Sequence, residues 1–231
     1  MSVYNEAKVH SLASIGGDDY WIDPHKLQKA YDFLKINTGY MLYHTAYRTL
    51  NEHTKVTKDV IVSESRDQDM EDFNDGNPVA APTAMYRKSV IPELGKWFEA
   101  APHEDWALWT MYALKGKIRY SNDVTTVYRL HDSSAYASLE NGKMLMWRMR
   151  AKSFIHFQIH KRQMDDFYTL NKHTFLSIFQ DQKIENKEFK EFFLYLEKQG
   201  VPKIGFLAFL FAGRKIGVLN SILFRHFNKK H

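Results

Sequence analysis

Two adjacent carboxylates stand near the beginning of the chain, in the run Gly16 to Pro24 (GGDDYWIDP). Asp18 and Asp19 follow a short apolar stretch, Ser11 to Ile15, which predicts a strand. In open α/β sheets, ligands collect beyond the carboxyl ends of strands, and neighbouring carboxylates there bind a hard divalent cation beside phosphates. The run therefore predicts a metal and phosphate site, although Gly-Asp is also an ordinary turn sequence.

Two further pairs of polar residues have types suited to chemistry. Glu104 and Asp105 stand where a predicted helix begins, and a helix N-terminus favours an ionised carboxylate that can accept a proton. Helix capping would select the same residues. Arg129 lies near the end of the predicted strand Val124 to Leu130, and His131 directly follows that strand; arginine suits bidentate contact with a phosphate, and histidine can bind a metal or make a structural hydrogen bond.

Aromatic and strand residues offer candidates for substrate contact. Tyr20 and Trp21 can form an aromatic wall for a sugar or an acceptor, or they can anchor the following helix in the core. Thr83 and Met85 alternate along a predicted strand, which is consistent with lining a pocket and equally with a buried strand.

The composition is that of a globular protein. Of 231 residues, 44% are hydrophobic and 15% aromatic, which excludes a disordered or low-complexity chain. The absence of cysteine excludes thiol catalysis, iron–sulfur clusters and thiolate zinc sites. The first residues lack the pattern of a secretory signal, so we expect a cytoplasmic location. The basic residues match no nucleic-acid-binding motif, so we expect no nucleic-acid partner.

Before residue 140, short β-type runs alternate with helical patterns, which predicts an α/β fold. The expected strands are Ser11 to Ile15, Tyr40 to Tyr47, Val60 to Ser63, Val79 to Tyr86 and Val124 to Leu130. One expected helix is Pro24 to Ile36, with Leu27, Tyr31 and Leu34 inward, and another is Glu104 to Lys115, with Leu108, Met111 and Leu114 inward. The acidic run Arg66 to Asn77 is expected to be a mobile loop.

Charge and pattern both change near Glu140, which predicts one region over residues 1–139 and another over 140–231. The first carries 15 basic and 19 acidic side chains, a balance of −4, and the second carries 17 and 8, a balance of +9. Helices are expected over residues 143–163, 167–180, 186–199, 204–211 and 215–227. The last has an apolar face flanked by basic residues, which is typical of a helix on an anionic membrane and also of a helix docked on the body.

Four motifs together resemble the family 2 glycosyltransferases. The run Ala7 to Leu34 (AKVHSLASIGGDDYWIDPHKLQKAYDFL) is similar to the family's stretch "KGKYIALLEGDDYWTDPxKLQKQVDFL" around its metal-binding motif. PTAMYR, from Pro82, resembles the family's "TAMFR" strand, and HEDW, from His103, its "GDW" or "ED" segment. KGKIRYSNDVTTVYRLH, which ends at His131, resembles "KGKIGYLNEVMGVYRIH". The motifs occur in the family's order, and residues 140–231 carry no resemblance.

The resemblance implies part of an A-type glycosyltransferase fold, with a Rossmann-like sheet followed here by a helical C-terminal region. Such enzymes transfer a sugar from a UDP- or GDP-sugar to an acceptor hydroxyl with inversion, assisted by magnesium or manganese. Asp18 would be the principal metal carboxylate, with Asp19 beside it. Arg129 would contact the donor diphosphate, and His131 would complete the metal site or contact the same phosphates.

The same resemblance also implies roles for residues that would contact the acceptor. Asp105 would be the general base and Glu104 its companion. Substrate contacts would come from Tyr20, Trp21, Thr83, Met85 and Trp106. The implied setting is polysaccharide or lipopolysaccharide assembly on a glycan or lipid-linked acceptor, with a cytoplasmic protein bound peripherally at the inner face of the cell membrane.

Two departures from the family pattern qualify these expectations. Gly16 stands where the family has an acidic residue two positions before the second carboxylate. Only 15 residues precede Gly16, whereas three βα units for the nucleotide would need about 90 residues. The pattern therefore predicts a chain without the N-terminal nucleotide-binding half, so that a partner chain would supply the missing strands. The alternative function is an inactive remnant that serves as a binding or membrane-peripheral interaction protein.

Overall fold

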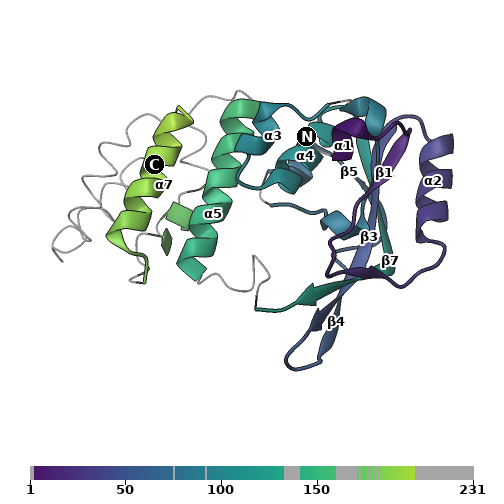
Figure 1. The fold of residues 1–231 in the computed structure, drawn as a ribbon, viewed down its shortest axis with the longest axis horizontal. Helices are drawn as coiled ribbons and strands as arrows, with labels where there is room; N and C mark the ends of the chain where they lie inside the picture. The colour runs from purple at the N-terminus through teal and green to yellow at the C-terminus, as the bar shows by residue number, and fades with distance from the viewer. Residues whose placement is uncertain are drawn as a thin grey trace. The chain divides into compact units, whose positions relative to one another are not determined.

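A computed structural model describes residues 3–74, 76–91, 93–132, 141–159, 171, 173–175, 177–178, 181 and 183–200. The chain divides into two compact units, Met1–Leu139 and Glu140–His231. The first unit is α/β, with a mixed sheet and helices, and the described part of the second is helical (Figure 1).

A seven-stranded sheet forms the framework of the first unit. Its central path runs in the order β1-β6-β3-β7-β2, with β4 added to β3 and β5 to β7. The strands are β1 Ser11–Ala13, β2 Tyr20–Trp21, β3 Tyr40–Asn51, β4 Thr57–Val60, β5 Arg66–Gln68, β6 Met85–Arg87 and β7 Lys117–Leu130. Strands β3 and β7 are parallel, and the other pairs are antiparallel.

The parallel pair β3 and β7 determines where the candidate site lies. Both strands are rich in aromatic and β-branched residues, which favour extended backbone. They begin together at Tyr40 and Lys117, pass three irregularities in register, and end together at Asn51 and Leu130. The segments that follow the two strands therefore leave the sheet side by side.

Helices cover the two sides of this sheet. α2 (Lys26–Ile36) lies on one side and α4 (Glu104–Ala113) on the other (Figure 1). Under α2, Ala30 and Leu34 pack against Tyr43 and Met85. α4 buries Trp106, Trp109 and Tyr112, and the ring centroids of Trp109 and Tyr86 are 5.0 Å apart. The remaining elements of this unit are short: α1 Val3–Glu6, α3 Lys96–Ala100, and the 3-10 turns η1 Met70–Phe73, η2 Ala81–Thr83 and η3 Lys88–Val90.

The buried face of α2 differs from the expected one. Lys26 is 2% exposed and lies with Ala30 on the inner face, whereas Leu27 and Tyr31 are 38% and 45% exposed. The reason is that the ammonium of Lys26 finds a partner inside: Nζ donates to the Thr83 carbonyl at 2.8 Å. Hydrophobic periodicity alone assigns a lysine to solvent, so the expected face was wrong at Leu27 and Tyr31, whereas Leu34 is buried as expected.

Several predicted boundaries were also wrong. The expected strand Val79 to Tyr86 is a 3-10 turn followed by the short β6, because Pro82 has no N–H to give to a ladder. The expected acidic loop contains β5 and η1, where the Asp69 side chain caps η1 and Asp72 pairs with Arg66. β7 begins at Lys117, before the expected strand start. α4 buries Leu108 as expected, but leaves Leu114 exposed.

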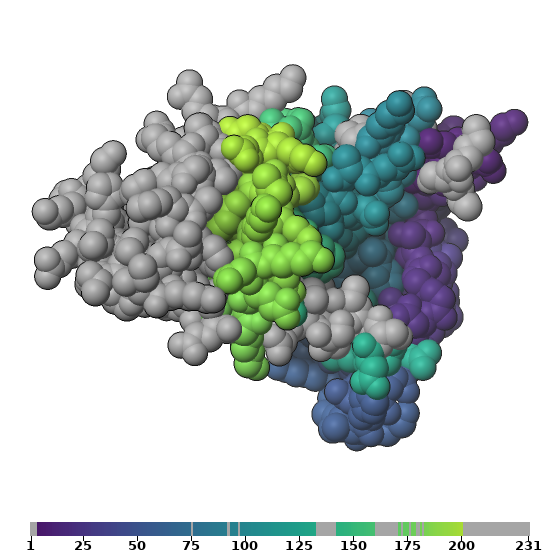
Figure 2. Space-filling model, turned by 60° about the vertical axis from the view of Figure 1, so that its left-hand side comes forward, coloured from purple at the N-terminus to yellow at the C-terminus, as the bar shows by residue number. Residues whose placement is uncertain are grey.

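The second unit is built around α5 (Asn141–Phe154), the π-helical turn η4 (Ile155–Ile159) and α7 (Asn186–Lys198). α7 begins with a capping box between Glu185 and Glu188, and Figure 2 shows the helix on the surface in yellow-green. The apolar cluster consists of Met146, Met149, Phe175, Ile178, Ile184, Phe189, Phe192, Phe193 and Leu196. The helices expected over 204–211 and 215–227 lie outside the described residues. Of the helices that are described, none has the length and apolar character needed to cross a membrane.

Candidate functional site

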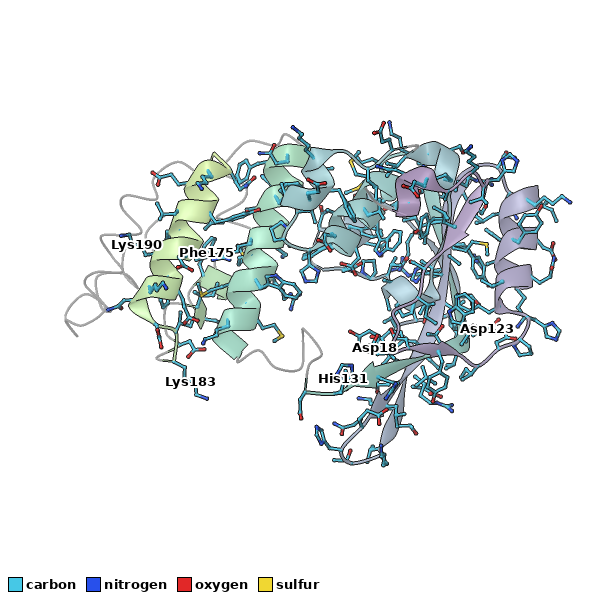
Figure 3. The ribbon with its side chains drawn as sticks, in the orientation of Figure 1. Asp18, Asp123, His131, Phe175, Lys183 and Lys190 are labelled. Atoms are coloured by element: carbon cyan, nitrogen blue, oxygen red, sulfur yellow. The ribbon has the colours of Figure 1, made fainter. Side chains whose placement is uncertain are left out.

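Three segments far apart in the sequence meet at the end of β7. They are the turn that carries Asp18 and Asp19, the residues at the end of β7, and the tip of the β3–β4 hairpin. His131 Nε2 lies 2.9 Å from Asp18 Oδ2, 113 positions away, and Figure 3 shows the two residues together. The Arg129 amide donates to Asp19 Oδ1 at 3.0 Å. The predicted metal and phosphate residues are therefore neighbours.

The Asp18 turn depends on a glycine. The Asp19 amide donates to the Gly16 carbonyl at 3.3 Å, which closes the turn. A Cβ atom on Gly16 would lie 2.6 Å from Asp18 Oδ1, so any side chain there would move the Asp18 carboxylate. At Gly17 a Cβ would meet nothing within 4 Å. The acidic residue that the family pattern places at position 16 thus conflicts with the position of Asp18 in this chain.

The two neighbouring carboxyl groups have opposite pKa shifts. The hydrogen bond from His131 is the largest cause that lowers the pKa of Asp18, followed by a backbone hydrogen bond. Burial is the largest cause that raises the pKa of Asp19, and the charge of Asp18 adds to it. Environments that move the pKa values of two such groups apart also give the groups different chemical roles. Asp18 is the ionised, accessible carboxylate, and Asp19 is the more buried one that supports the turn.

Arg129 is held between the hairpin and the turn. Its Nε donates to Glu52 Oε1 at 2.6 Å, and its Nη1 donates to the Asp18 carbonyl at 3.1 Å. Lys55 Nζ donates to Glu52 Oε2 at 2.8 Å. Lys55 is the largest cause that lowers the pKa of Glu52 to about 2, and Arg129 is the next. The predicted phosphate ligand thus has a carboxylate partner that sequence reasoning missed.

The hairpin tip is built by its own turn residues. Asn51 Oδ1 accepts the amides of His53 at 3.0 Å and Thr54 at 2.9 Å, and Lys55 adopts a left-handed backbone with φ of 56°. His53 Nε2 then lies 2.7 Å from Asp132 Oδ1, just past the end of β7. The run Asn51 to Lys55 was readable as a turn, but nothing in it indicated which part of the chain it would contact.

Asp105 lies at the start of α4 with both carboxylate oxygens engaged. Oδ1 accepts the Trp106 amide at 2.7 Å and lies 3.1 Å from His103 Nδ1, while Oδ2 accepts from Asn77 Nδ2 at 2.9 Å. The N-cap residue of α4 is His103, and α4 has no side-chain cap hydrogen bond, so the helix-capping role considered from the sequence was wrong for Asp105. Glu104 beside it is exposed.

Three carboxylates affect the pKa of Tyr128, a partly buried residue of β7. Burial is the largest cause that raises the pKa of the Tyr128 phenol, followed by the charges of Asp19 and Asp18; Asp105 contributes a smaller part. Sequence reasoning also missed this residue.

The remaining predicted residues range from exposed to fully buried. Tyr20 is 45% exposed. Trp21 is partly buried; its Nε1 donates to the Pro82 carbonyl at 2.9 Å, and Lys26 Nζ lies 5.4 Å from its ring centroid. These contacts give Trp21 an anchoring role next to α2.

Three predicted substrate residues are covered in this conformation. Thr83 is completely buried, and its Oγ1 donates to the Ala80 carbonyl at 2.6 Å. Met85 packs in the cluster under α2. Trp106 is 2% exposed, and its Nε1 donates to the Phe73 carbonyl at 3.2 Å.

The pair Asp18 and His131 fits part of a divalent cation site. An octahedral cation with ligands at about 2.1 Å holds adjacent ligand atoms about 3.0 Å apart. Asp18 Oδ2 and His131 Nε2 are 2.9 Å apart, a hydrogen-bond contact that the two atoms would give up to become neighbouring ligands. No group of three or more metal-ligating side chains occurs in the part of the chain that the structure describes. Such a site would take its other ligands from water and substrate phosphates.

Comparison with known proteins gives no family. None of the family models searched matches the chain, and no curated protein matches it either. The function is therefore argued from the site and from the sequence resemblance.

Proposed function

We propose that this protein is a metal-assisted glycosyltransferase of the family 2 type, which transfers a sugar from a UDP- or GDP-sugar to an acceptor hydroxyl with inversion. The observation that carries the proposal is the meeting of Asp18, Asp19, Arg129 and His131 at the end of β7, from positions more than 100 residues apart. The mixed sheet would then be part of an A-type glycosyltransferase fold.

On the donor side, Asp18 and His131 would hold magnesium or manganese, with the Asp18 carboxylate as the ligand type that both cations suit. The bound cation would neutralise charge on the departing nucleotide diphosphate. Arg129 lies next to this pair, with Nη1 on the Asp18 carbonyl and Nε on Glu52. Its guanidinium adds positive charge beside the expected phosphate position.

On the acceptor side, Asp105 would take the proton of the attacking hydroxyl. The acceptor oxygen bonds to the anomeric carbon while the bond from that carbon to the diphosphate oxygen breaks, which inverts the configuration. Asn77 and His103 orient the Asp105 carboxylate through contacts of 2.9 and 3.1 Å. Tyr20, the more exposed of the two aromatic residues, is the better candidate to contact a sugar ring.

A second candidate function is binding without transfer. The hydrogen bonds of Asp105 favour this function. Both of its carboxylate oxygens already accept hydrogen bonds, and such hydrogen bonds make a carboxylate a weaker base. In this case the same donor-side residues would bind a nucleotide-sugar, and turnover would be absent.

The cellular setting belongs to the same proposal. The basic second region, with a balance of +9, would contact an anionic membrane at the cytoplasmic face, where glycan or lipid-linked acceptors are assembled. A partner chain could add strands beside β1, which pairs with β6 and lies at one end of the described sheet. Deleting residues 215–231 should reduce binding to vesicles containing phosphatidylserine, and equal binding without them would contradict the membrane part.

Calorimetry tests the central proposal. UDP- and GDP-sugars are titrated with and without Mn²⁺ into the wild type, Asp18→Asn and the control Asp123→Asn. Asp123 is an exposed aspartate paired with Lys29 at 3.4 Å, away from the site (Figure 3). We expect manganese-dependent binding that is lost in Asp18→Asn and kept in Asp123→Asn. Absence of binding in the wild type, or equal binding in Asp18→Asn, would reject the proposal.

A further inference from the structure

Glu52 lies at the junction between the hairpin and the end of β7. Its amide donates to the Leu130 carbonyl at 2.9 Å, which extends the β3–β7 pairing by one step and fixes its backbone beside β7. In Figure 2 the hairpin, in blue, and the end of β7, in green-teal, are adjacent on the surface. From this fixed backbone the Glu52 side chain reaches the guanidinium of Arg129.

The carboxylate of Glu52 is shared between two cations. Oε1 accepts from Arg129 Nε at 2.6 Å, and Oε2 accepts from Lys55 Nζ at 2.8 Å. The side chain of Glu52 is 22% exposed and that of Arg129 is 37% exposed, so the pair is partly shielded from water. With its pKa lowered to about 2, chiefly by Lys55, Glu52 stays ionised at any physiological pH.

Arg129 also contacts the turn that carries Asp18 and Asp19. Its guanidinium is planar, so fixing the direction of Nε also fixes the direction of Nη1. Nη1 donates to the Asp18 carbonyl at 3.1 Å, and the Arg129 amide donates to Asp19 Oδ1 at 3.0 Å. One residue thus connects the hairpin to both carboxylate-bearing residues of the turn.

We propose that Glu52 is a positioning residue: by holding Nε of Arg129 it directs Nη1 to the Asp18 carbonyl and so fixes the turn that carries Asp18 and Asp19. This positioning role is inferred from the contacts alone and does not require the proposed function. Its consequence for cation binding rests on the proposed function.

Hydrogen exchange tests the positioning role without requiring activity. Peptides covering residues 16–20 are compared in the wild type, Glu52→Gln, Arg129→Lys, the double variant and the control Glu99→Gln, which changes an exposed glutamate. We expect exchange to become about two- to fivefold faster in Glu52→Gln, the range for a partly exposed ion pair. Arg129→Lys, which keeps the charge but loses the planar fork, should act in the same direction.

The double variant decides whether the two residues act together. If Glu52 acts through Arg129, its removal adds little once Arg129 is replaced, so the two effects are not additive. Exchange at wild-type rates in Glu52→Gln, additive effects in the double variant, or an equal acceleration in Glu99→Gln would each overturn the inference.

A second measurement connects the positioning role with the site. The Mn²⁺ concentration that gives half-maximal UDP binding should rise by about the same two- to fivefold factor in Glu52→Gln, with saturation still reached at high Mn²⁺. An unchanged Mn²⁺ requirement, despite faster exchange, would overturn the functional consequence. If the wild type fails to bind UDP and Mn²⁺, the proposed function fails, and the exchange experiment still tests the positioning role.

Discussion

Asp18 is held by side chains more than 100 positions away in the chain, whereas Asp105 is held mainly by its own neighbours. His131 and Arg129 contact Asp18 and its turn across the sheet. Asp105 depends on Trp106 and His103 at the start of α4, with Asn77 as its more distant partner. The donor side therefore depends on the register of the sheet, and the acceptor side on the beginning of one helix. Substitutions should affect the two sides separately.

The largest expected effect separates transfer from binding. In Asp105→Asn we expect transfer to fall by about 10²- to 10⁴-fold, the range for loss of a general base. Nucleotide-sugar binding should stay unchanged, because the donor-side contacts remain. Single-turnover transfer and calorimetry measure the two quantities, with Asp123→Asn as the control. Unchanged turnover would remove Asp105 from the mechanism.

The next effect is confined to the donor side. His131→Ala removes one of the two side chains that fit a cation, so Mn²⁺ affinity should fall at least about tenfold. Titration of Mn²⁺ followed by electron paramagnetic resonance measures this affinity. Asp132→Asn is the matched control, since Asp132 pairs with His53 and not with Asp18. A comparable loss in both variants would indicate a general disturbance of the end of β7.

A smaller effect comes from the turn itself. Gly16→Ala places a Cβ where Asp18 Oδ1 lies, so the carboxylate must rotate away from its position beside His131. A side chain displaced from its rotamer costs about 0.5–1.5 kcal/mol, which corresponds to about two- to tenfold weaker Mn²⁺ binding. Gly17→Ala, which meets no atom, should bind as the wild type does. Equal affinities in the two variants would contradict the role of Gly16.

The smallest effect is on stability against acid. Because the pKa of Asp18 is lowered in the folded state, its contribution is present above the unfolded pKa of about 3.9 and is lost as the pH falls through the folded value. The side chain is 48% exposed, so the contribution is at most about 1 kcal/mol. Urea unfolding of wild type and Asp18→Asn should differ at pH 6 and converge near pH 2. A difference that grows on acidification would contradict the shift.

The sequence was most informative where a motif also determines local structure. Asp18 and Asp19 were named from their position after a predicted strand, and Arg129 and His131 from the family resemblance; the structure brings the four residues together. The α/β class of the first region followed from alternating patterns. The assignment of these residues to a glycosyltransferase stays a proposal.

Other features depended on tertiary contacts that no local pattern carries. Glu52 belongs to the site only because the parallel pairing of β3 and β7 brings the hairpin beside Arg129. Lys26 is buried only because a carbonyl of another segment accepts a hydrogen bond from its ammonium group. Tyr128 was passed over since the carboxylates that raise its pKa come from separate segments of the chain.

Gly39 and Gly116 lie close together where the parallel strands β3 and β7 begin. A Cβ on Gly116 would lie 2.8 Å from the Gly39 carbonyl oxygen, so the two strands leave a shared, tightly packed origin. Glu52 is 13 residues past Gly39, and Arg129 is 13 residues past Gly116. Deleting or inserting one residue in either strand would shift its end by about 3.3 Å and turn the following side chains to the opposite face. β7 already has two residues more than β3, a difference that the register irregularities absorb, so a further change of length would need another irregularity to keep Glu52 beside Arg129.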